Sequence, residues 1–192
     1  MSAAWILAVA LLAPGAPRPG APAADPLPPA SAAERAQRLE VALGMIHGSP
    51  SPGFWRALGP EAVPELLRLA RDGDALPSRR ARALEGLSWL GGDRAAAALR
   101  EMSAAEDLPF SVRAAALEGA GRLLPPAEVR RVLAPVLQGA RRAADRAVAA
   151  EVMAERDPAA GCPALRARLP REAERDRGVF ARALSRCAAR GR

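Results

Sequence analysis

The stretch RARALEG, from Arg80 to Gly86, returns almost unchanged as RAAALEG, from Arg113 to Gly119, 33 residues further along the chain. A third related stretch, RAVAAEV, begins after the same interval at Arg146. Self-similarity at a fixed period of about 20 to 50 residues is typical of repeat proteins, in which one supersecondary unit stacks on the next. This period constrains the fold more than any other feature of the sequence.

Each repeat is predicted to contain two helices. Apolar and small residues recur at steps of three and four, as in Ala114, Leu117 and Gly121, and therefore share one face of a helix. Gly or Pro closes each stretch, and a second helical segment follows. These second segments are EAVPELLRLARDG, DRAAAALREMSAAE, PAEVRRVLAPVLQG and DPAAGCPALRARL.

Composition supports helices over strands. Apolar residues make up 50% of the chain, but many of them are alanines, and aromatics account for only 3%. One Ala/Leu helix pair cannot bury its own apolar face, so each pair is stable only against a neighbour. The sequence therefore predicts an all-α fold over residues 31–192, an α-solenoid of antiparallel helix pairs with about four to five repeats.

Two segments carry a resemblance to a known family. They are DLPFSVRAAALEGAGRLL, which begins at Asp107, and GPEAVPELLRLARDGD, which begins at Gly59. Both resemble HEAT repeats of the short, PBS-lyase-like type. The resemblance implies an α-solenoid that serves as an adaptor or scaffold, and in some members as a lyase, although no lyase site can be transferred to residues of this chain.

The N-terminus is predicted to be an export signal. The apolar run from Trp5 to Ala13 is much shorter than the roughly 20 residues that span a bilayer, and Ala21-Pro22-Ala23 fits a signal-peptidase site. We expect a signal peptide over residues 1–23, a Pro-rich disordered lead-in over 24–30, and a periplasmic or secreted protein without a transmembrane anchor after cleavage. The alternative is an Ala-rich leader that stays on a cytosolic protein.

Two polar positions recur with the repeat. The arginine row consists of Arg80, Arg113 and Arg146, and it is predicted to bridge neighbouring repeats. Asp74 and Asp107, six residues before the first two arginines, are expected to cap helix starts.

The glutamate row is Glu85, Glu118 and Glu151. Five helical residues separate each of these glutamates from the arginine of the same repeat, so the two rows lie on different faces of the helix. The glutamate row is interpreted as a solvated stripe or, alternatively, as part of a binding surface for a basic partner.

Few residues suggest chemistry. His47 is the only histidine, the two cysteines lack a CxxC spacing, and no Gly-rich phosphate loop is present. We therefore expect no catalytic, cofactor-binding or metal-binding residues, no cofactor and no enzymatic activity.

The partner is expected to be another protein. All 28 basic residues are arginines, which gives a net charge of +7, but acidic residues alternate with them and aromatics are scarce. Nucleic acid is therefore not expected, and an Arg-rich binder of nucleic acid or of an anionic membrane remains the alternative to a scaffold. Phe54 and Trp55 are predicted to be exposed partner contacts or, alternatively, to cap the N-terminal end of the core.

Cys162 and Cys187 are predicted to form a disulfide. Cys162 begins one predicted helix and Cys187 lies near the end of the next. Consecutive antiparallel helices bring these two ends together, within reach of a bridge. Two buried free thiols are the alternative.

Overall fold

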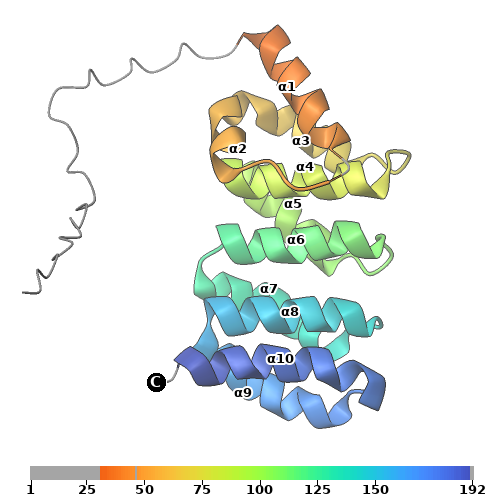
Figure 1. The fold of residues 1–192 in the computed structure, drawn as a ribbon, viewed down its shortest axis with the longest axis vertical. Coiled ribbons are helices and arrows are strands. Elements are labelled where there is room, and N and C mark those ends of the chain that lie inside the picture. Colours follow the sequence, from red (N-terminus) through yellow and green to blue (C-terminus); the bar gives the residue numbers. More distant parts are fainter. Residues whose placement is uncertain (1–30, 46, 191–192) are drawn as a thin grey trace, which may run out of the picture.

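The computed structural model describes residues 31–45 and 47–190 (Figure 1), so the predicted signal peptide and lead-in lie outside the described residues. Over this part the chain forms α-helices and two short 3-10 turns, without a β-strand, which confirms the all-helical class. The helices are α1 (Ala32–Gly44), α2 (Pro52–Leu58), α3 (Val63–Arg71), α4 (Pro77–Leu90), α5 (Asp93–Ala104), α6 (Phe110–Leu123), α7 (Pro126–Gly139), α8 (Ala143–Arg156), α9 (Pro158–Arg168) and α10 (Glu174–Arg190).

Most of the helices lie in two rows. Figure 1 shows α4, α6, α8 and α10 side by side, with α5, α7 and α9 behind them. Along the front row, α4 contacts α6, α6 contacts α8, and α8 contacts α10; along the back row, α5 contacts α7 and α7 contacts α9. The repeated stretches therefore occupy equivalent places on the neighbouring helices α4 and α6.

The core is built from repeat-equivalent positions. Leu84, Leu117 and Ala150 stand 33 residues apart and are fully buried, one on each of α4, α6 and α8. The residue before each of them is a buried alanine. Burying a leucine side chain contributes about 1.5–3 kcal/mol, so each helix is stabilised mainly by its neighbours.

Small residues permit the helices of the front row to approach closely. Ser88, Gly121 and Ala154 occupy equivalent positions and are all buried. A Cβ atom at Gly121 would overlap the Cγ1 methyl of Val152 on α8. A larger side chain would therefore push α6 away from α8.

The N-terminal end differs from the rest because α2 is inserted between α1 and α3. Trp55 on α2 is fully buried, and a Cβ at Gly86 would lie 2.7 Å from its Cζ3 atom. Phe54 meets Trp55 edge-on, with ring centroids 5.6 Å apart, and is half-buried. The prediction of two exposed aromatic contacts is therefore wrong for Trp55, because α4 carries a glycine where the indole packs. Trp55 fills the core instead.

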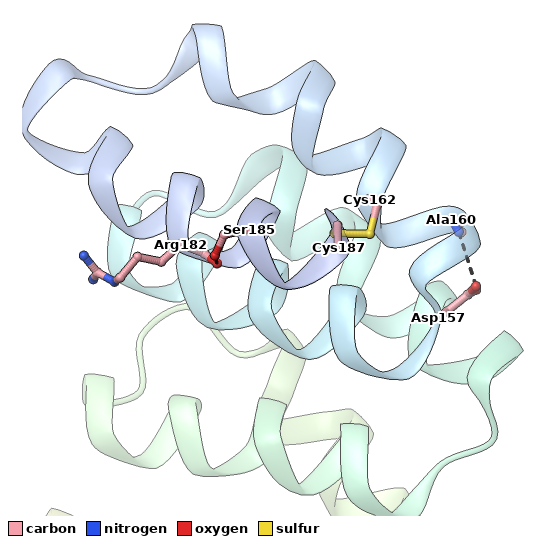
Figure 2. The surroundings of a disulfide bond; sticks show 6 residues. All are labelled: Asp157, Ala160, Cys162, Arg182, Ser185 and Cys187. Atoms are coloured by element: carbon pink, nitrogen blue, oxygen red, sulfur yellow. Dashed lines mark hydrogen bonds between the residues drawn. A yellow bond between two sulfur atoms is a disulfide. The ribbon is translucent and has the colours of Figure 1, made fainter. Parts of the chain in front are cut away.

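The C-terminal helices are joined covalently. Cys162 on α9 and Cys187 on α10 form a disulfide with a Cα–Cα distance of 5.9 Å, the pairing that the sequence predicts (Figure 2). Both cysteines are buried. At the start of α9, the Asp157 carboxylate accepts a hydrogen bond of 3.3 Å from the N–H of Ala160, which satisfies one free donor of the first turn.

Candidate functional site

The arginine row fastens each front helix to the helix before it. The Nε atom of Arg80 donates to the carbonyl of Ala70 at 3.0 Å, and that of Arg113 donates to the carbonyl of Ser103 at 3.0 Å. Both arginines are buried. Arg146 donates to the carbonyl of Ala140 at 2.7 Å. These carbonyls lie at or just beyond the carboxyl ends of α3, α5 and α7, where helical acceptors lack partners within their own helix. The row is therefore part of the framework.

Asp74 and Asp107 do not cap helices, contrary to the prediction. Both are exposed, and the residues that precede the first turns of α4 and α6 are Leu76 and Pro109, neither of which makes a side-chain capping bond. The physical reason is distance along the chain, because each helix begins at least two residues later than an Asp cap requires.

The acidic partners of the arginine row were missed from the sequence. Asp145 on α8 is fully buried and accepts hydrogen bonds from Arg113 at 2.8 Å and from Arg142 at 2.9 Å. Glu172 is likewise buried and pairs with both Arg146 and Arg168. The hydrogen bond from Arg146 holds the pKa of Glu172 below its usual value. Neither acid recurs at the repeat interval, so the repeat gave no signal for them.

The glutamate row lies along a groove on the front row of helices. Glu85, Glu118 and Glu151 are carried by α4, α6 and α8 in turn. The groove consists of two depressions, with volumes of about 400 Å³ and about 140 Å³, that share Glu118 and Arg122. The larger is lined by Trp89, Glu118, Gly121, Arg122, Val148, Glu151, Val152, Glu155, Arg156 and Arg186. The smaller is lined by Ser49, Glu85, Ala115, Glu118 and Arg122.

Most charges that line the groove have partners of their own. Glu85 pairs with Arg82 at 3.1 Å, and Glu151 lies 4.0 Å from Arg186 on α10. The guanidinium of Arg122 lies 4.5 Å from the ring centroid of Trp89. It also donates a hydrogen bond of 2.5 Å to the hydroxyl of Ser88. These contacts hold Arg122 against α4.

Glu118 is the exception at the centre of the groove. Within the described part of the chain, its carboxylate makes no hydrogen bond and no ion pair within 4.0 Å. Burial raises the pKa of Glu118, the positive charge of Arg122 lowers it, and the negative charges of Glu85 and Glu151 raise it further. The groove therefore holds a partly desolvated carboxylate without a direct partner.

Comparison with protein-family models, curated proteins and solved structures finds no match to this chain. The groove is therefore interpreted from its own residues. Among the described residues, no three His, Cys, Asp or Glu side chains come together in a way that could hold a metal ion. No helix in that same part of the chain is both long and apolar enough to cross a bilayer.

Proposed function

We propose that the chain is a non-catalytic protein-interaction scaffold of the cell envelope, built as an α-solenoid of HEAT-like repeats. The 33-residue period and the two rows of helices support the solenoid. Repeat proteins of this kind bind partners along the extended surface that their stacked units share. The groove on α4, α6 and α8 is such a surface in this chain.

The observation that carries the proposal is the equivalence of the groove residues. Glu85, Glu118 and Glu151 recur at the repeat interval, as do Trp89, Arg122 and Glu155. Each repeat thus contributes the same two positions, one helical turn apart, to one continuous surface. An extended segment of another protein can contact successive repeats along it in the same way.

An arginine-rich binder of nucleic acid receives less support. Many surface arginines lie beside carboxylates, for example Arg71 with Glu101 at 2.8 Å and Arg79 with Glu40 at 2.9 Å. A phosphate backbone would have to compete with these carboxylates for the guanidinium groups. The groove, moreover, has a carboxylate at its centre.

The export part of the proposal rests on the predicted leader and is consistent with the disulfide, since such bonds persist in oxidising compartments. We expect the natively expressed protein to be recovered from the periplasm or the medium with an N-terminus near Ala24. N-terminal sequencing checks this. A protein that keeps Met1 or Ser2 would contradict export.

The scaffold function can be tested by affinity capture from an envelope fraction with a groove-filling variant. Val148 lines the larger depression and is half-buried, so Val148→Trp should occupy the groove without changing its charge. Ala127→Trp, at an exposed position on α7, is the matched control. We expect a specific partner to be retained by the wild type and the control and lost by Val148→Trp. Equal capture by all three folded proteins would exclude the groove as the binding surface.

A further inference from the structure

The groove leaves one charge without a direct partner. Glu85 and Glu151, on either side of Glu118, each lie within 4.0 Å of an arginine, and Arg122 is held by Trp89 and Ser88. Glu118 belongs to both depressions, so a segment that runs along the groove passes over its carboxylate. A partly desolvated anion is costly unless the occupant supplies a compensating charge.

We infer that Glu118 is the contact for a positively charged side chain, an arginine or lysine, on an extended segment of the bound protein. This inference rests on the proposed function, and it names the chemistry of the partner at the same surface. Since Glu118 lies between two like charges, a cation placed against it also reduces repulsion along the glutamate row.

The neighbouring surface is suited to the rest of such a segment. Val148 and Val152 supply an apolar wall beside Glu118, and Trp89 supplies an aromatic one. Gly121 leaves room between α6 and α8 because it has no side chain. Arg156 and Arg186, which line the same depression, come from α8 and α10, so they restrict a positively charged partner to the part of the groove near Glu118.

The probes for the test are three blocked Gly/Ser peptides of equal length. One carries arginine at alternate positions, the second carries the neutral isostere citrulline at those positions, and the third carries glutamate. Binding to the isotope-labelled full chain is followed by NMR at about 0.15 M ionic strength, where weak surface attraction is screened. The reporters are the side-chain carboxyl carbon of Glu118 and the indole N–H of Trp89.

We expect the arginine peptide to bind more tightly than the other two, to shift both reporters and to lower the pKa of Glu118. Glu118→Gln should weaken its binding about tenfold, which corresponds to the loss of one charged hydrogen bond. Glu101→Gln is the matched control, because Glu101 is exposed on α5 and pairs with Arg71. This control should bind as the wild type does.

Equal binding of the arginine and citrulline peptides, or equal binding by wild type and Glu118→Gln, would overturn the inference. So would an arginine peptide that does not bind, or that shifts resonances away from Glu118. If Val148→Trp still loses a captured partner in that case, the scaffold function stands and only the partner chemistry is wrong. If capture does not depend on Val148 either, both proposals fail.

Discussion

Arg113→Ala is expected to lower the free energy of unfolding by about 3–5 kcal/mol, the range for breaking a buried ion pair by removing one partner. The exposed fractions of the Arg113 and Asp145 side chains are 2% and 0%. Without the guanidinium, the carbonyl of Ser103 also loses its side-chain donor. Arg142 still donates to Asp145, but it lies at the edge of the site and does not replace the contact with Ser103.

The measurement is urea denaturation, with midpoints compared at equal slope so that the change reflects stability. Arg68→Ala is the matched control, because Arg68 makes an exposed ion pair with Glu65, and its midpoint should change little. The double variant Arg113→Met with Asp145→Leu should be more stable than Arg113→Ala, since no unpaired buried carboxylate remains. Equal midpoints for wild type and Arg113→Ala would show that the arginine row does not hold the repeats together.

Removing the disulfide is expected to cost about 3 kcal/mol, the chain-entropy value for a loop of this size. The bond joins residues separated by 25 positions and links α9 to α10, the last helix of the row. Because α10 packs on α8 and α9 and has no further helix of the described chain beyond it, the effect should be concentrated in its amides.

The double variant Cys162→Ala with Cys187→Ala tests this through urea denaturation and hydrogen exchange. Faster exchange is expected over α10, while the amides of α4 and α6 should change much less. Thiol counting under denaturing, non-reducing conditions provides the control on the starting material. Two free thiols per chain would contradict the bond, and uniform acceleration of exchange along the whole chain would contradict its local role.

Features that recur with the repeat could be predicted from the sequence. The helix pairs from α4 to α9 lie close to the predicted segments, because helical spacing and the closing Gly or Pro are local properties. The cysteine pair could also be predicted, because antiparallel neighbours bring the start of one helix to the end of the next.

Features that depend on packing between helices could not be predicted. Asp145 and Glu172 each partner an arginine on another helix or repeat position, and neither has a counterpart at the repeat interval. The burial of Trp55 depends on the missing side chain of Gly86, more than thirty residues later in the sequence. The central place of Glu118 likewise appears only when α4 and α8 are set on either side of α6.

The bonds of the arginine row also bear on mechanics. Each of these arginines ties its helix to a carbonyl of the preceding unit, so Arg80, Arg113 and Arg146 brace successive joints rather than single units. A stack braced at its joints resists stretching and bending. We therefore expect the groove to behave as a ruler of fixed pitch, which selects a partner by the interval between its contact groups as well as by their charge.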